Sequence, residues 1–134
     1  MVIHCRQAHE DMLAVLHDWT ARLPERSSPG VIHCFMGDTE TTRQYLEMGF
    51  YLSLAGYITY PVNRSARDVT RSIPADRLMV ETDCPFLTPQ PYRSQRNEPA
   101  YVRYTAEELA RIRDVSLETL ARETTENARR LFGW

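Results

Sequence analysis

The chain has 134 residues, of which 43% are hydrophobic and 25% charged, as in one ordinary globular domain and unlike a disordered segment. The formal net charge of −2 excludes a broad basic surface, so any contact with nucleic acid must be confined to a site. No apolar run approaches the ~20 residues of a membrane span, and the N-terminus lacks a secretory signal. We therefore expect no membrane partner and a cytoplasmic location.

Apolar and polar periodicities predict an alternation of strands and helices. In the first helix region Met12, Leu16 and Trp19 form an apolar stripe, while His9 and His17 are assigned to packing or solvated roles. The expected elements are strand 1–4, a helix from residue 8 ending within 24–30, strand 31–35, a helix from Asp38 or Thr39 to about Met48, strand 50–55, helix 65–72 and a strand from Leu78. This pattern predicts an α/β fold with a parallel sheet.

A long irregular stretch follows the last expected strand. Residues 84–101 contain four prolines and are too long for a simple connection, which indicates a functional loop over the strand ends.

The C-terminal part is predicted to be helical. Thr105 and Glu108 have the spacing of a capping box, and Ser116 opens a second helical segment. Leu131 and Phe132 are expected to dock its end against the rest of the domain.

Three of the apolar runs end on groups that can bind a metal. His4 and His33 each follow a Val-Ile pair, and Glu81 and Asp83 follow the run from Leu78. Parallel strands present their carboxyl ends on one side of the fold, so these four side chains are expected to converge. A single such histidine is more often a hydrogen-bonded core residue, but burying the two carboxylates without a cation would cost several kcal/mol each. Mixed nitrogen and oxygen ligands suit zinc, manganese or another divalent ion.

The three cysteines form no C-x-x-C pair and are expected to be free thiols. Cys5, Cys34 and Cys84 each directly follow a candidate ligand, so along a strand they would point away from it. We interpret them as small packing residues.

Four stretches carry a family resemblance: 4–10 (HCRQAHE), 33–37 (HCFMG), 81–85 (ETDCP) and 96–99 (RNEP). In order and spacing they resemble the TatD family of metal-dependent hydrolases, and the resemblance runs through the whole chain. It implies a TIM-type barrel, a divalent-metal site at the strand C-termini and, in several members, nuclease activity on DNA.

The chain also departs from that family pattern. TatD-like proteins begin with a strand bearing an H-x-H pair and carry a bridging glutamate on the fourth strand, and neither has a counterpart here. Residues 1–134 are therefore expected to be a single partial barrel domain, strands five to eight plus the C-terminal helices, since a whole barrel needs ~250 residues. The open edges of such a half barrel predict self-association.

Carried over position by position, the resemblance implies roles for the four strand-end groups. His4 and His33 would bind one metal and Asp83 the other, with two cations in a complete site and magnesium, manganese and zinc not distinguished. Asp83 would also carry catalysis by holding metal and water, and Glu81 is the weaker catalytic candidate, supporting from behind the ligands.

Three further residues are candidates for binding substrate. Arg6 and Arg96 could take a phosphate through paired hydrogen bonds, although a salt bridge at the strand end explains Arg6 equally well. Asn97 has either a substrate role or the role of fastening the long loop to the barrel rim.

The leading functional hypothesis is metal-assisted hydrolysis of DNA phosphodiester bonds, with little activity expected from the 134-residue chain alone because ligands are missing. Amide, ester or lactone hydrolysis on the same barrel is the enzymatic alternative. A non-catalytic fragment or interaction module is the alternative from another class.

Overall fold

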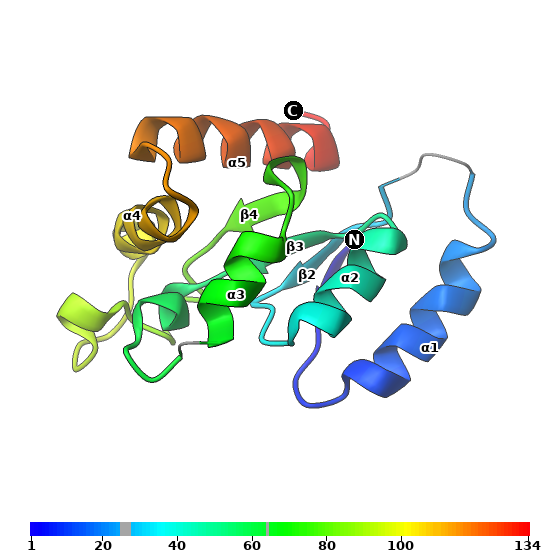
Figure 1. Cartoon of the computed structure of the whole chain (residues 1–134), viewed down its shortest axis with the longest axis horizontal. Coiled ribbons are helices and arrows are strands. Elements are labelled where there is room, and N and C mark those ends of the chain that lie inside the picture. Colours follow the sequence, from blue (N-terminus) through cyan, green and yellow to red (C-terminus); the bar gives the residue numbers. More distant parts are fainter. Residues whose placement is uncertain (25–27, 64) are drawn as a thin grey trace.

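The computed structural model describes residues 1–24, 28–63 and 65–134. The predicted alternation of strands and helices is confirmed (Figure 1). The strands and α-helices are β1 (Val2–His4), α1 (His9–Thr20), β2 (Val31–His33), α2 (Thr39–Glu47), β3 (Tyr51–Leu54), α3 (Ser65–Ser72), β4 (Leu78–Val80), α4 (Val102–Arg113) and α5 (Leu117–Phe132). The segment expected to end α1 includes residues 25–27, which lie outside the described residues.

The four strands form one parallel sheet in the order β1-β2-β3-β4, as predicted. β1 and β2 pair in a register that sets Val2 opposite Val31 and His4 opposite His33. Because all strands run in one direction, their carboxyl ends lie along a single edge of the sheet. The register therefore places the two histidines side by side at that edge.

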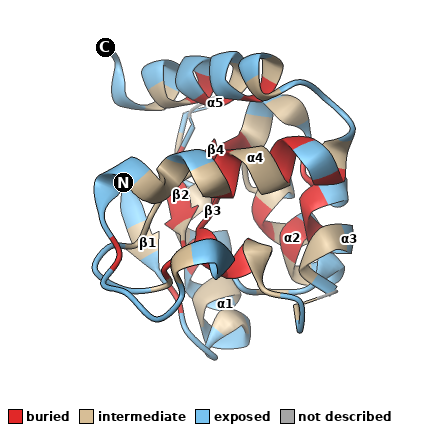
Figure 2. Cartoon of the chain, turned by 90° about the vertical axis from the view of Figure 1, so that its left-hand side faces the viewer, coloured by how far each residue is buried: buried red, intermediate tan, exposed pale blue. Residues whose placement is uncertain are grey.

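One face of the sheet forms the main hydrophobic core. Ile32, Leu52 and Leu78 are each at most 1% exposed. They pack in one cluster with residues from all five helices, among them Leu16, Tyr45, Val69, Leu109 and Leu120. Figure 2 shows the buried residues concentrated on the strands and on the helix surfaces that face them.

Helix α5 covers part of the other face of the sheet. Val31, Tyr51 and Met79 point to this face, since side chains alternate along a strand, and they pack against Ala128 and Leu131. His33 lies two residues beyond Val31 and so points to the same face, nearer the strand ends. The α5 side of the sheet is therefore the side on which the candidate ligands lie.

Helix α5 begins as predicted at Ser116, whose hydroxyl accepts a hydrogen bond from the Thr119 amide at 3.0 Å. It continues to Phe132, so the two residues expected at its end are its last ones. Docking of its end is confirmed for Leu131 only, because Phe132 is 48% exposed. None of the described helices combines the length and apolar character needed to cross a membrane.

The capping box predicted at Thr105 and Glu108 is wrong. Helix α4 begins at Val102, directly after a 3-10 turn at Pro99–Tyr101, so the chain already has helical geometry and needs no side-chain cap. Thr105 is fully buried inside the helix, and Glu108 instead pairs with Arg111 at 2.7 Å.

Candidate metal centre

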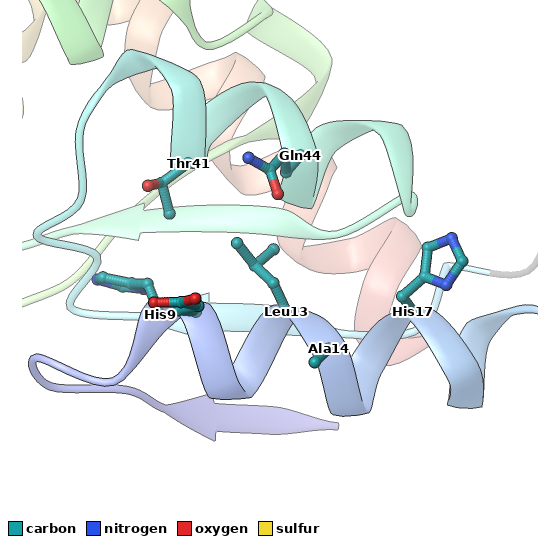
Figure 3. A pocket seen from close by; sticks show the side chains of 7 residues that line it. His9, Leu13, Ala14, His17, Thr41 and Gln44 are labelled. Carbon is teal, nitrogen blue, oxygen red and sulfur yellow. The ribbon is translucent and has the colours of Figure 1, made fainter.

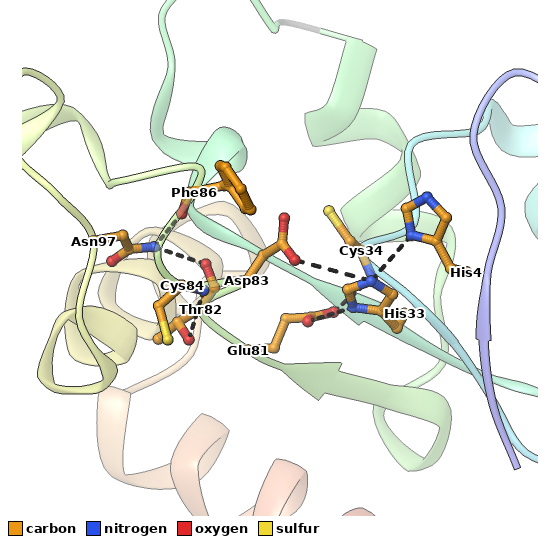
Figure 4. Close-up of polar contacts among 9 residues, drawn as sticks. All are labelled: His4, His33, Cys34, Glu81, Thr82, Asp83, Cys84, Phe86 and Asn97. Atoms are coloured by element: carbon orange, nitrogen blue, oxygen red, sulfur yellow. Dashed lines mark hydrogen bonds and ion pairs between the residues drawn. The ribbon is translucent and has the colours of Figure 1, made fainter.

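The ends of β1, β2 and β4 bring the four predicted ligand residues together (Figure 4). His4 and His33 are the last residues of their strands, and Glu81 follows β4 directly, its amide donating to the Leu54 carbonyl of β3 at 3.1 Å. The side chains of His33, Glu81 and Asp83 are 24%, 21% and 27% exposed. They are therefore only partly buried and open to a ligand, whereas the sequence analysis treated the two carboxylates as buried.

Both oxygens of Glu81 are engaged in fixing its neighbours. Oε2 lies 2.7 Å from His33 Nδ1, and Oε1 accepts a hydrogen bond from the Cys34 amide at 2.6 Å. A carboxylate at this distance favours a proton on Nδ1 and leaves the lone pair on Nε2. Glu81 thus sets the ring orientation and the tautomer of His33.

The other ring nitrogen of His33, Nε2, points to the remaining two ligand candidates. Nε2 lies 3.2 Å from His4 Nδ1 and 3.9 Å from Asp83 Oδ1. Two nitrogens that share a tetrahedral zinc ion at about 2.0–2.1 Å lie about 3.3 Å apart, so the histidine pair has a spacing that fits a shared cation. One ligand atom each from His33, Glu81 and Asp83 also lies within 4.8 Å of the others. The donor set of imidazole nitrogens and carboxylate oxygens fits a divalent ion.

The backbone changes direction immediately beyond the strands. Cys34 and Asp83 have φ angles of 47° and 56°, in the left-handed region that is uncommon for residues other than glycine. At Asp83 this conformation follows two residues after Glu81, so the chain turns away while both carboxylates stay at the strand end. Aspartate is among the residues that adopt this region more often than others, whereas a cysteine at position 34 gives no such signal.

The cysteines are free, as predicted. Cys5 and Cys34 are buried and match the packing interpretation, whereas Cys84 is exposed and that interpretation is wrong for it. Cys84 lies beyond the end of β4 in the turn after Asp83, so strand alternation does not apply to it. Burial, with the nearby carboxylates of Asp83 and Glu81, raises the pKa of the Cys34 thiol to about 12. In this environment the thiol stays protonated at neutral pH.

The substrate candidates divide into two kinds. Arg6 and Arg96 are exposed, and within the described residues neither forms an ion pair or hydrogen bond. Asn97 is only 4% exposed, and its amide group is used within the loop: Nδ2 donates to the Thr82 and Phe86 carbonyls, and Oδ1 accepts from the Glu98 amide. With both amide hydrogens engaged, the geometry of Asn97 favours the loop-fastening alternative.

Histidines 9 and 17 lie away from the ligand group and have the roles predicted for them. His9 Nδ1 lies 3.1 Å from the Tyr45 hydroxyl and its ring packs on Phe35, while the His17 side chain is 78% exposed. Both line a pocket of about 440 Å³ between α1 and α2, which Leu13 and Gln44 also border (Figure 3). None of the four strand-end ligand candidates lines this pocket.

These features define a parallel α/β domain with a candidate metal centre at its strand ends. The model of the TatD related DNase family matches residues 1–133, so the chain belongs to this family. Its fold is that of part of a TIM-type barrel, as predicted.

Curated relatives and solved structures agree with this assignment. The chain is 45% identical, over 98% of its length, to the uncharacterized metal-dependent hydrolase YabD of Bacillus subtilis. It is 40% identical, again over 98%, to the 3'-5' ssDNA/RNA exonuclease TatD of Pantoea ananatis. Among solved structures it resembles YJJV, a TatD homologue from Escherichia coli, with a TM-score of 0.89 and 25% identity over 99% of this chain. A TatD family hydrolase from Entamoeba histolytica gives a TM-score of 0.82 at 22% identity over 98% of this chain.

The chain spans about half the length of these proteins: 50% of YabD, 51% of the Pantoea exonuclease, 49% of YJJV and 50% of the Entamoeba protein.

Proposed function

We propose that this chain supplies part of the active site of a metal-dependent hydrolase that cleaves DNA phosphodiester bonds. The observation that carries the proposal is the convergence of His4 Nδ1, His33 Nε2 and Asp83 Oδ1, with Glu81 holding the His33 ring from behind. The names of the relatives, a metal-dependent hydrolase and a single-strand exonuclease, support the reaction and the substrate.

Each ligand group has a distinct role in the proposed site. His4 and His33 hold one cation and Asp83 holds a second, magnesium, manganese or zinc, while Glu81 keeps the His33 lone pair directed at the site. A divalent cation held there supplies Lewis acidity and a water whose pKa is lowered from 15.7 towards ~7. In this proposal Asp83 also accepts a hydrogen bond from the attacking water.

Arg6 and Arg96 bind the phosphate in this proposal. Their guanidinium groups are exposed, and a planar fork matches the oxygens of a phosphodiester. Asn97 contributes indirectly, by fastening the segment that carries Arg96 to the turn beyond Asp83.

The first experiment measures metal binding by the chain itself. Native mass spectrometry and isothermal titration calorimetry with Mn²⁺ and Zn²⁺ should detect a bound ion of modest affinity. A catalytic ion usually has three or more protein ligands, and this chain supplies fewer than three to each proposed ion. His33→Ala should abolish this binding, and Asp18→Asn, in an exposed carboxylate of α1, should leave it unchanged. Equal ion retention by all three proteins would contradict the site.

The second experiment measures hydrolysis. We expect slow cleavage of a labelled oligonucleotide, or none, by the chain alone, and strong metal-dependent cleavage after co-expression with the first half of YabD, which would add the expected missing ligands. Asp83→Asn should remove this activity and Asp18→Asn should not. Metal-dependent turnover of p-nitrophenyl esters with DNA left intact would replace the nuclease proposal by its ester-hydrolase alternative.

The expected self-association and cytoplasmic location stay predictions. Sedimentation velocity at micromolar concentration tests the former: a monodisperse monomer would show that the sheet edges do not drive association.

A further inference from the structure

A phenylalanine beside the metal centre is left in solvent. Phe86 follows Asp83 by three residues and is 69% exposed, so its ring is available to a ligand next to the strand-end carboxylates. Figure 4 shows its ring and the Asp83 carboxylate on the same side of the turn that joins them, while Asn97 lies on the other side. The aromatic face is therefore presented at the rim of the candidate metal centre.

The backbone that carries this exposed ring is held firmly. The Phe86 amide donates to the Asp83 carbonyl at 2.9 Å, and the Phe86 carbonyl accepts from Asn97 Nδ2 at 2.5 Å. Asn97 also donates through its own amide to the Pro85 carbonyl at 3.2 Å and through Nδ2 to the Thr82 carbonyl at 2.8 Å. An aromatic ring on a backbone fixed in this way loses little conformational freedom when a flat partner stacks on it.

The same hydrogen bonds place an arginine next to this turn. Arg96 directly precedes Asn97, whose backbone and side chain are tied to residues 85 and 86. The Arg96 side chain is exposed and, within the described part of the chain, has no carboxylate partner. An aromatic face and a free guanidinium on adjoining backbone segments match the base and the phosphate of one nucleotide.

We propose that Phe86 is a base-stacking residue that selects single-stranded nucleic acid at this site. The inference rests on the proposed function and extends it from the reacting phosphate to the neighbouring base. Bases in a duplex are covered on both faces by their neighbours, so only an unpaired base, or a base at a strand end, can offer a face to Phe86. The ring stacks on that base, Arg96 pairs with its phosphate, and the contact tolerates any base because every base has a π-face.

The test separates base stacking from phosphate binding and from cleavage. Fluorescence anisotropy is measured in EDTA, so that no hydrolysis occurs, with a labelled dT oligonucleotide, an abasic oligonucleotide of equal length and a duplex. The variants are Phe86→Leu, which keeps an apolar side chain without a ring, and Phe86→Trp, which keeps a ring. Trp134→Leu is the matched control, since Trp134 is another aromatic side chain, 74% exposed, at the C-terminus.

Phe86→Leu should weaken binding of the dT oligonucleotide about 5- to 150-fold, the range that loss of one stacking aromatic costs. Phe86→Trp should restore it, and Trp134→Leu should bind as the parent does. The abasic oligonucleotide and the duplex should bind weakly to all variants. Equal affinity of the parent for dT and abasic strands, or no effect of Phe86→Leu, would overturn base stacking while leaving metal-dependent cleavage intact. Absence of binding to every oligonucleotide would overturn the nucleic-acid substrate and base stacking together.

Discussion

The face of the sheet that forms the main core and the carboxyl ends of the strands differ in role, although they contain adjacent residues. In β2, Ile32 is completely buried in the main core, and the next residue, His33, is 24% exposed among ligand candidates. A similar contrast spans two neighbouring strands: Leu54, at the end of β3, is completely buried, and Glu81, which directly follows β4 and donates its amide to the Leu54 carbonyl, has a side chain that is 21% exposed. Stability and chemistry are therefore separable by substitution, although the residues concerned are neighbours.

The largest effect on stability is expected from a substitution in the face of the sheet that forms the main core. Leu52→Ala removes a completely buried side chain at the centre of the main core and should lower the free energy of unfolding by about 2–5 kcal/mol. Urea denaturation followed by circular dichroism measures this, with Val62→Ala, 78% exposed, as the control. A loss below about 1 kcal/mol would mean that the core repacks around the site.

At the strand ends, Glu81→Gln should act on metal binding. The amide is similar in shape but loses the charge that orients His33 Nδ1, so the affinity for Mn²⁺ or Zn²⁺ should fall about 10- to 100-fold. Calorimetric titration measures the affinity, and nitrogen chemical shifts of the His33 ring report the tautomer. The control is Glu40→Gln in an exposed pair on α2. Unchanged affinity together with a changed tautomer would show that ring orientation does not limit binding.

A smaller effect on stability is expected where the long loop meets the strand ends. Asn97→Ala leaves the Thr82 and Phe86 carbonyls without their donors and should cost about 1–2 kcal/mol, because water reaches part of this turn. Hydrogen exchange at the Phe86 amide should become faster as well. Gln95→Ala, an exposed neighbour, should change neither quantity. A loss of cleavage by the chain co-expressed with the first half of YabD, without any loss of stability, would instead favour a direct substrate role for Asn97.

The smallest effect on stability concerns His9, the first residue of α1, whose ring contacts Phe35 and Tyr45. Burial lowers its pKa below the ordinary 6.5, with only a partial opposing effect from Asp38, so the unfolded chain binds the proton more tightly than the folded one. Its contribution to stability is complete above pH 6.5 and is lost as the pH falls through that value towards the folded-state pKa. Proton NMR titration should give the lowered pKa directly. Stability curves of the parent and His9→Gln should diverge only in this acidic range, and a His9 pKa above 6.5 would contradict the assignment.

Local patterns correctly predicted the elements that depend on neighbouring residues alone. The apolar runs gave the strands, and Asp38 and Ser116 cap α2 and α5 as expected, since a cap is formed within one helical turn. The prediction failed at Thr105, where the start of α4 depends on the preceding turn, and at Cys84, where the strand had already ended. Both errors arose from extending a local rule past the end of the element that justified it.

The sequence by itself determined the α/β alternation, the parallel sheet and the gathering of His4, His33, Glu81 and Asp83 at one end, because parallel strands bring their carboxyl ends together. Only the tertiary structure decided what each group does there. Glu81 divides its two oxygens between the His33 ring and the Cys34 amide, and Asn97 fixes the backbone of the exposed Phe86. Both arrangements depend on distances between segments 11 to 48 residues apart in the chain. Such contacts follow from strand register and from unusual backbone angles beyond the strands, and neither leaves a periodic signal in the amino-acid sequence.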